Sequence, residues 1–369
     1  MEFTVLRQTL RSALENIKAT VKPVTGDNYS TFVKVEVKPT EQEMSLVGYN
    51  LETGAISVLN VEAVEYAEFL VSIDDFAAIV SKLNGDTLEC DYNDDVLAIK
   101  CGRSRTKIPT QSADRYPSIP DVTSSNNFTM SAVTLADMIR QTVFAVAVTD
   151  NKPILMGELF DILDYNFNLV AIDGYRLAVR SKKIESDNHY HFVVKAKALS
   201  EVSKLLKDDE KETVTMHVSK KHITFEIGRY MLFSRLLEGD FHNYKGSIPA
   251  NHNSEIIINT REFISALERC MLIINEKAKA PVRCLFNDGK VKLSCSTALG
   301  KFVDEFEADT AGPSVEIGFN CRYLLDALKA TESDKVRLQL NGGLSPMKIV
   351  PMDGNAYTFL VLPTRLKAE

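Results

Sequence analysis

Three stretches of this 369-residue sequence follow one plan: FTVLRQTLRSALENIKATV (3–21), FTMSAVTLADMIRQTVFAV (128–146) and IIINTREFISALERCMLII (256–274). They start 125 and then 128 residues apart. Each is typical of a short strand of β-branched or aromatic residues that runs directly into an amphipathic helix. The apolar positions of the three helices coincide, so that Leu10 corresponds to Leu135 and Phe263. A recurrence at this period predicts three copies of one structural unit.

A second strand-to-helix pattern recurs in the back half of each third, in FLVSIDDFAAIVSKL (69–83), FVVKAKALSEVSKLL (192–206) and VEIGFNCRYLLDALK (315–329). Strand patterns closed by turn residues follow each of them. The sequence therefore predicts an α+β fold of three repeated domains, with the helices gathered on one side of antiparallel sheets. Polar, strand-poor connectors at 121–127 and 249–254 place the domains at 1–121, 127–248 and 254–369.

The composition is that of an ordinary soluble globular protein, with 45% hydrophobic and 25% charged residues. No stretch approaches the roughly 20 apolar residues that cross a bilayer, and the first residues lack the features of a secretory signal, so we expect a cytoplasmic protein without a membrane partner. The cysteines lie far apart without a C-x-x-C pair, which predicts buried or half-buried free thiols rather than a metal or redox site: Cys90, Cys101, Cys270, Cys284, Cys295 and Cys321.

The formal net charge is −7, and all of the excess acid lies in residues 1–121, with 12 basic and 19 acidic side chains. Basic residues nevertheless align on the predicted helices. These are Arg7, Arg11 and Lys18, then Arg140, then Lys197, Lys204 and Lys207, and finally Arg322 and Lys329. Two interpretations stay open: these are ordinary exposed helix faces, or they face nucleic-acid phosphates without reading sequence.

No sequence motif of a known catalytic centre is present: there is no phosphate-binding glycine loop, no H-E-x-x-H and no G-x-S-x-G. His189 and His191 could place two imidazoles on one strand face, but no third metal ligand is nearby, so a polar strand edge is the favoured interpretation. We therefore predict no catalytic residue, no metal and no cofactor.

The segment NLVAIDGYRLAVRS (168–181) resembles the signature of the bacterial DNA polymerase III beta subunit, the sliding clamp, which typically has LVATDGHRLA at this point. Further segments resemble this family in the expected order: NKPILMGELFDI (151–162), LLEGDFHNY (236–244), NEKAKAPVR (275–283), VEIGFNCRYLLDAL (315–328) and VLPTRL (361–366). The resemblance extends over the whole chain and agrees with the threefold repeat.

The resemblance implies a DNA sliding clamp, a non-catalytic processivity factor of DNA polymerase III. In this family two three-domain subunits form a head-to-tail homodimeric ring around double-stranded DNA, with helices lining the hole and sheets outside. The partners implied are sequence-independent DNA, the DNA polymerase III catalytic subunit, the clamp loader and other proteins with a clamp-binding motif. The helix residues expected to face DNA are Arg7, Arg11, Lys18, Arg140, Lys197, Lys204, Arg322 and Lys329.

The resemblance also implies an apolar pocket between the second and third domains for partner peptides that carry a Gln and two or three bulky apolar residues. Its expected residues are Leu155, Ile172, Gly174, Tyr175, Arg176, Leu177, His242, Ser247, Leu360, Leu362, Pro363, Thr364, Arg365 and Leu366. Gly174 is expected to permit a tight turn, and Arg176 and Arg365 to border the pocket. Several positions depart from the family: Tyr175, Ile172 and Thr364 replace a common His, Thr and Met, and His242, Gly246 and Ser247 replace Pro, Arg and Val. We expect these changes to alter which peptides bind best.

The subunit interface of this family joins the first domain of one chain to the third domain of the other. The matching residues are Arg103, Arg105, Thr106, Ile108, Leu272 and Ile273. Ile108 is expected to be the apolar contact of the first domain, whereas Thr106 replaces a usual Phe and should weaken the ring. The alternative function is a clamp-like peptide-binding adaptor that does not load on DNA.

Overall fold

The computed structural model describes residues 1–24, 26, 29–121, 126–149, 152–185, 189–206, 209, 211–274 and 280–366. Contacts within the chain form two compact units, residues 1–136 with 197–236 (unit 1) and residues 137–196 with 237–369 (unit 2). The middle repeat therefore contributes to both units. Two parts of the predictions lie outside the described residues: residues 122–125 of the connector predicted at 121–127, and Lys207, which is predicted to lie on a helix face.

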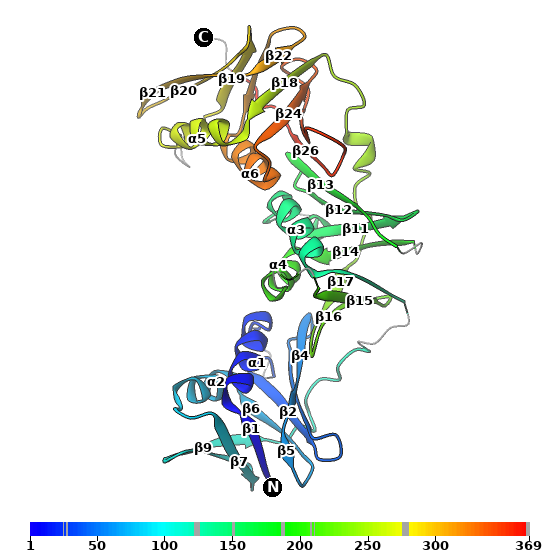
Figure 1. The fold of residues 1–369 in the computed structure, drawn as a ribbon, viewed down its shortest axis with the longest axis vertical. Coiled ribbons are helices and arrows are strands. Elements are labelled where there is room, and N and C mark those ends of the chain that lie inside the picture. The colour runs from blue at the N-terminus through cyan, green and yellow to red at the C-terminus, as the bar shows by residue number, and fades with distance from the viewer. Residues whose placement is uncertain are drawn as a thin grey trace. The chain divides into compact units, whose positions relative to one another are not determined.

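Unit 1 is built on antiparallel strands in the order β5-β1-β7-β8-β9-β6-β2-β3-β4-β17-β16-β15-β10. Helices α1 (Arg7–Thr20) and α2 (Ile73–Lys82) pack on each other (Figure 1), and α4 spans Ala196–Leu205. The strands are β1 (Glu2–Leu6), β2 (Phe32–Lys38), β3 (Glu43–Tyr49), β4 (Thr53–Asn60), β5 (Glu62–Ala63), β6 (Ala67–Ser72), β7 (Thr87–Asn93), β8 (Val96–Cys101), β9 (Ser104–Gln111), β10 (Asn127–Ser131), β15 (Thr213–Val218), β16 (His222–Ile227) and β17 (Tyr230–Leu237).

Unit 2 holds two antiparallel sheets, β14-β11-β12-β13-β26-β25-β24-β18-β22 and β21-β20-β19-β23. Helices α5 (Thr260–Met271) and α6 (Cys321–Thr331) lie side by side (Figure 1), and α3 (Ala132–Thr142) enters this unit from the other. The strands are β11 (Gly157–Leu163), β12 (Asn166–Ile172), β13 (Arg176–Lys183), β14 (Tyr190–Lys195), β18 (Ser254–Asn259), β19 (Val282–Asn287), β20 (Lys290–Thr297), β21 (Gly300–Glu307), β22 (Asp309–Ala311), β23 (Val315–Phe319), β24 (Lys335–Leu340), β25 (Met347–Pro351) and β26 (Tyr357–Val361); short 3-10 turns are η1 (Val143–Ala145), η2 (Pro153–Met156) and η3 (Lys245–Ser247).

The three repeats begin their first helix in the same way. The leading strands β1, β10 and β18 pair with β7, β15 and β24, respectively. The first helical N–H then donates to the carbonyl of the acidic residue just before that partner strand, as in Arg7 to Asp86 (2.8 Å), Ala132 to Glu212 (2.9 Å) and Thr260 to Asp334 (2.9 Å). These bonds satisfy one of the amides that every helix start leaves unpaired. The sequence repeat is thus a repeat of hydrogen bonding.

The core lies where the helical periodicity predicts it. The matched positions of the first helices are each at most 1% exposed: Leu10, Leu14, Leu135, Ile139, Phe263 and Leu267. All six cysteines are free and buried, which confirms the prediction of unpaired thiols. Burial raises the pKa of the Cys90 thiol to about 12, so at neutral pH this residue is a small apolar side chain of the core.

Candidate functional site

An apolar cleft of about 640 Å³ lies in unit 2. Its floor includes Leu177 at the start of β13 and Leu360 on β26, each only 2% exposed. These strands pair with Leu177 opposite Leu360, so the two side chains come from adjacent positions of one sheet. The remaining lining residues are Lys152, Ile154, Leu155, Ile172, Gly174, Arg176, Asp240, His242, Ser247, Pro346 and Leu362. A mostly apolar concave surface with a few polar groups at its edge is the usual form of a small-ligand or peptide site.

The turn at Asp173–Arg176 shapes one side of this cleft. Gly174 has a φ of +88°, which a residue with a side chain adopts only with strain. One oxygen of Asp173 accepts hydrogen bonds from the amides of Tyr175 and Arg176, both at 2.9 Å. The tight turn expected at this glycine is present.

Arg176 is a buried structural cation, not a free group at the edge of the cleft. It is 8% exposed, and its guanidinium donates to Asp173 and to Asp326 of α6, both at 2.8 Å. It also lies 4.5 Å from the ring centre of Tyr323. Since a buried charge is tolerated only when it is paired, these contacts hold the turn against helix α6. Arg176 thus lines the cleft, as expected, and is also a buried cation that joins the turn to helix α6.

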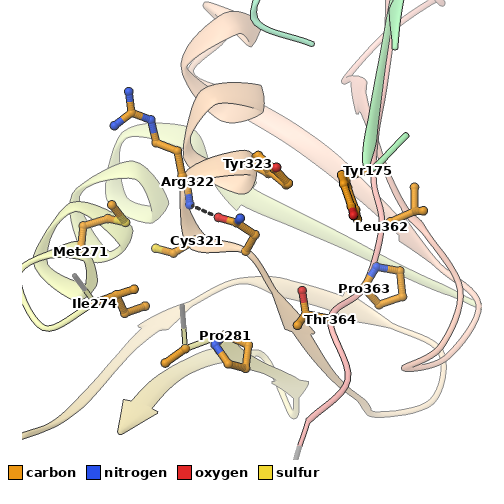
Figure 2. A pocket seen from close by; sticks show the side chains of 12 residues that line it. Tyr175, Met271, Ile274, Pro281, Cys321, Arg322, Tyr323, Leu362, Pro363 and Thr364 are labelled. Carbon is orange, nitrogen blue, oxygen red and sulfur yellow. Dashed lines mark hydrogen bonds between the residues drawn. The ribbon is translucent and has the colours of Figure 1, made fainter. Parts of the chain in front are cut away.

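A second cavity of about 750 Å³ adjoins the cleft, because Leu362 lines both. Figure 2 shows Tyr175 and Tyr323 facing each other beside Leu362; their ring centres are 6.0 Å apart. Pro363 and Thr364 line this cavity together with Met271, Ile274, Ala280, Pro281 and the start of α6. The Leu362 amide donates to the Tyr175 carbonyl (2.9 Å), and the Thr364 amide donates to Gly318 (2.8 Å). The C-terminal segment therefore runs between the two cavities.

The fourteen predicted pocket residues are thus divided. Nine line the cleft: Leu155, Ile172, Gly174, Arg176, Leu177, His242, Ser247, Leu360 and Leu362. Tyr175, Pro363 and Thr364 line only the second cavity. Arg365 and Leu366 line neither, and Leu366 lies where a side chain at Gly318 would be. Sequence comparison missed four lining residues of the cleft: Lys152, Ile154, Asp240 and Pro346.

A buried carboxylate supports the rim of the cleft from below. Asp161 on β11 accepts a hydrogen bond from the Tyr244 hydroxyl (2.6 Å) and pairs with the Lys245 ammonium (3.0 Å). Burial alone would raise the pKa of Asp161, but the hydrogen bonds from Tyr244 and Lys245 outweigh it and hold the pKa below its usual value. Tyr244 begins the short turn that carries Ser247, which is 2.9 Å from the imidazole of His242. Asp161 is therefore bonded to the two residues that begin the turn carrying Ser247.

A second buried carboxyl, Glu158 on β11, is 0% exposed in the same unit. The Thr142 hydroxyl lies within hydrogen-bond distance of Glu158 and also donates to the Met138 carbonyl (2.7 Å). The Thr142 hydroxyl is the donor to Glu158 as well, so its one proton is shared between these acceptors. Burial raises the pKa of Glu158 to about 8, and the hydrogen bond with Thr142 only partly offsets this effect. Burial therefore favours the neutral form of Glu158 near pH 7.

Comparison with known proteins assigns the chain to a family. Three family models of the DNA polymerase III beta subunit match in order: the N-terminal domain over 1–120, the central domain over 129–243 and the C-terminal domain over 245–365. The chain belongs to the DNA polymerase III beta subunit family. It is 29% identical to the beta sliding clamp of Staphylococcus epidermidis over 99% of both chains. The solved sliding clamp of Bacillus subtilis is 27% identical with a TM-score of 0.95 over 100% of both chains, and the beta subunit of Pseudomonas aeruginosa is 27% identical with a TM-score of 0.94 over 99% and 100%.

This family membership identifies the chain as a DNA sliding clamp, a non-catalytic processivity factor with the three-domain clamp fold. None of the described helices is long and apolar enough to span a membrane. Within the described residues, no three His, Cys, Asp or Glu side chains are grouped to hold a metal ion. His189 and His191 instead lie near Asp164 (3.6 Å) and Asp161 (3.4 Å).

The basic helix residues predicted to face DNA mostly have acidic neighbours. In unit 1, Arg11 pairs with Glu15 (2.8 Å), Lys18 with Asp74 (2.5 Å) and Lys204 with Glu201 (2.9 Å), whereas Arg7 donates to the Gly85 carbonyl (2.6 Å). In unit 2, Arg140 pairs with Glu332 (2.7 Å), Arg322 with Asp326 (3.2 Å) and Lys329 with Glu268 (2.7 Å). Lys197 is exposed and has no ion pair within the described part of the chain. Each unit therefore presents cations whose charge is largely balanced locally.

Two strand edges are available for the predicted subunit interface. The outer edge of β9 pairs only at Thr110 and Gln111, and its exposed residues include Arg105 and Lys107, next to Arg103 in the preceding turn. The role of Ile108 as the apolar interface contact stays a prediction; within its own chain this side chain is 5% exposed and packs in the core. The alternation of SRTKIPTQ explains why, since residues two apart share a face and Ile108 shares the inward face with Thr110.

The other edge belongs to β21 in unit 2, the last strand of its sheet. It carries Asp304, Glu305 and Glu307, opposite in charge to β9. Three exposed apolar side chains accompany it: Leu272 (79% exposed), Leu299 (63%) and Val303 (63%). Ile273 is half-buried beside them, and its carbonyl accepts a hydrogen bond from Thr297 (3.0 Å). The β21 edge, with its acidic and exposed apolar side chains, is therefore a stronger candidate for the subunit interface than the β9 edge.

Proposed function

We propose that this sliding clamp encircles duplex DNA as a head-to-tail homodimer in the cytoplasm and tethers the DNA polymerase III catalytic subunit through the cleft in unit 2. The observation that carries the proposal is the cleft itself: in a chain that matches the family throughout, nine residues expected from the family's peptide pocket line one cavity. The clamp loader and other proteins with a clamp-binding motif would use the same cleft.

The cleft supports recognition of an extended peptide with bulky apolar side chains. Its floor is buried leucine and isoleucine, and its edge carries Lys152, Asp240, His242 and Ser247. An apolar anchor would gain roughly 1.5–3 kcal/mol on full burial. The polar edge would pair with the glutamine and with the residues that flank the apolar anchors. The second cavity offers the Tyr175–Tyr323 pair to the continuation of the same peptide.

The paired basic residues support loose, sequence-independent contact with DNA. Exposed ion pairs contribute about 0–1 kcal/mol each, so a phosphate can replace the carboxylate partner of Arg11, Lys18 or Lys329 at little cost. The same carboxylates keep these cations from gripping DNA strongly. A closed ring does not need a strong grip, because the DNA is held by topology.

The two strand edges support the head-to-tail dimer. An edge strand has unpaired N–H and C=O groups along its length, and β9 of one subunit can add to β21 of another. Their opposite charges favour this pairing over contacts between two like edges. The exposed Leu272 and Val303 would be covered on assembly.

The test is to measure product lengths made by the DNA polymerase III catalytic subunit on primed circular DNA, with clamp loader and ATP, with and without this protein. We expect long products only with the protein, and short products again when an excess of the polymerase's clamp-binding peptide occupies the cleft. A protein that binds the peptide but neither stays on the circle nor lengthens products would instead be the clamp-like adaptor. Gel filtration at falling protein concentration tests the ring, because a monomer throughout contradicts the dimer.

A further inference from the structure

One carboxylate in unit 2 is shared by an arginine of the cleft and an arginine of the helix expected to face DNA. Asp326 on α6 accepts from Arg176 through one oxygen (2.8 Å) and pairs with Arg322 through the other (3.2 Å). The exposed fractions of the side chains rise outward along this series, from 9% for Arg176 to 25% for Asp326 and 69% for Arg322. The three groups form a continuous path from the cleft wall to the helix surface.

We propose that Asp326 couples DNA contact at Arg322 to the peptide-binding cleft, so that DNA in the ring strengthens peptide binding. The inference rests on the proposed function, since it requires both a DNA-facing α6 and a peptide in the cleft. It concerns the regulation of the cleft, which the family assignment does not provide.

The two ion pairs of Asp326 differ in strength. Arg322 and Asp326 lie one helical turn apart, and Arg322 is exposed. This ion pair therefore contributes at most about 1 kcal/mol, and a phosphate can readily replace Asp326 as the partner of Arg322. The Arg176 pair is buried and is a charge-assisted hydrogen bond. When DNA attracts Arg322, Asp326 loses its competing partner, and both of its oxygens become available to the planar guanidinium of Arg176. Arg176, which lines the cleft, is then held more firmly by Asp326.

The path continues from Arg176 into the surface that a peptide would touch. Arg176 also binds Asp173, whose second oxygen fixes the amides of the Gly174 turn. The Tyr323 ring lies under the Arg176 guanidinium (4.5 Å) and faces Tyr175. Figure 2 shows Arg322 and Tyr323 as neighbours on α6, with the Arg322 side chain pointing away from the tyrosine pair. A tighter Asp326–Arg176 contact therefore orders the turn and the tyrosine pair before the peptide arrives, which lowers the entropic cost of binding.

Two states and two sites define this coupling. Without DNA, Asp326 is divided between two cations; with DNA, it serves Arg176 alone. Because coupling between two binding events is reciprocal, a bound peptide should increase the affinity for DNA by the same factor. The exposed pair limits the size of the effect to roughly two- to fivefold.

The experiment measures the affinity of a fluorescent clamp-binding peptide by anisotropy, with and without linear duplex DNA that threads through the ring, at low salt. DNA occupancy is followed in parallel with labelled DNA. The unmodified protein should bind the peptide roughly two- to fivefold more tightly with DNA present. Because Arg322 also lines the second cavity, the peptide used is one short enough to fill the cleft alone, and Arg322→Gln should bind it with the tighter affinity in both conditions. Asp326→Asn should show no DNA dependence and should bind more weakly, because Arg176 loses a charged partner.

Arg261→Gln is the charge-matched control. Arg261 lies on α5, is 86% exposed and pairs only loosely with Asp334 (3.8 Å), away from the Asp326 path. It should retain the DNA dependence of the unmodified protein. A DNA-dependent change that persists undiminished in Arg322→Gln overturns the inference, as does an unmodified protein that binds DNA and peptide independently. Failure to bind either one refutes the proposed function instead.

Discussion

The cleft and the basic helix faces of this clamp both depend on arginine, but they hold it in opposite ways. Arg176 is buried, fixed by two carboxylates at 2.8 Å and covered by an aromatic ring. Arg322 is exposed and has one carboxylate at 3.2 Å, on its own helix. The fixed position of Arg176 gives the cleft a defined surface that suits one kind of partner. The exposed position of Arg322 leaves a cation free to exchange partners, as contact with moving phosphates requires.

The difference has an energetic consequence. Removing one partner of a buried pair leaves an uncompensated charge and costs roughly 3–5 kcal/mol, whereas exposed pairs contribute about 0–1 kcal/mol. Changes in the cleft should therefore produce large and specific losses. Changes on the helices should be small one at a time and should depend on salt.

The largest effect is expected from a charge on the cleft floor. Leu177→Asp should lower peptide affinity on the order of 100-fold or more, because an ionised carboxylate there faces an apolar surface. Isothermal titration with the clamp-binding peptide measures the loss. Leu362→Asp, at a 38% exposed position on the rim, should fold normally and also lose binding. Leu163→Asp, at an exposed leucine outside the cleft, is the matched control, and a loss of equal size there would contradict the assignment.

The next effect concerns the buried Glu158. Its folded-state pKa of about 8 lies above the value of 4.5 for an unperturbed carboxyl, so the folded protein holds a proton that the unfolded chain has released. The stability from this group is complete below about pH 4.5 and is lost as the pH rises toward 8, by on the order of 1 kcal/mol per pH unit. Glu158→Gln should flatten this dependence in urea unfolding between pH 5 and 8. Equal pH dependence in both proteins would show that Glu158 is ionised in the fold.

A smaller effect is expected at the support of the rim. Tyr244→Phe removes the hydrogen bond to Asp161 and retains the buried ring. It should weaken peptide binding roughly three- to tenfold, which is less than the full contribution of about 1.5–3 kcal/mol from one hydrogen bond to a charged group, because the Lys245 pair still holds Asp161. Asp161→Asn should weaken binding further, and the two changes together should be less than additive. Strict additivity would mean that Asp161 does not act through Tyr244.

The smallest effect is expected on the helices. The test replaces three residues together by Gln: Arg7, Arg11 and Lys197. The slope of the logarithm of the binding constant for linear DNA against the logarithm of salt concentration should become shallower, by at most about one unit for each phosphate that is no longer neutralised. The lifetime of the loaded ring on circular DNA should change by less than about twofold, because topology holds the DNA. Unchanged salt dependence would remove these residues from the DNA-facing set.

The repeats and their cores could be predicted from sequence because both depend on local periodicity. Leu10, Leu135 and Phe263 recur at one helical phase and are all buried. The burial of Ile108 within its own chain also follows from the alternation of its strand, and its part in the subunit interface stays a prediction. The cleft could be inferred only through resemblance, since its residues come from five separate segments.

The missing parts of the site depend on contacts distant in sequence. Asp326 lies 150 residues from Arg176, and no local pattern indicates that they meet. Asp161 lies 83 residues before Tyr244, inside a strand whose polar residues gave no sign of a rim support. Lys152 and Asp240 join the cleft through loops whose paths depend on tertiary packing.

Retention of DNA by topology is tested by comparing the lifetime of the loaded ring on closed circular DNA and on the same DNA cut once by a restriction enzyme, over a range of salt concentrations. We expect a long lifetime on the circle that changes little with salt, and rapid release after linearisation at every salt concentration. A lifetime that is equal on circular and linear DNA and falls steeply with salt would contradict it, because charge rather than topology would then hold the DNA.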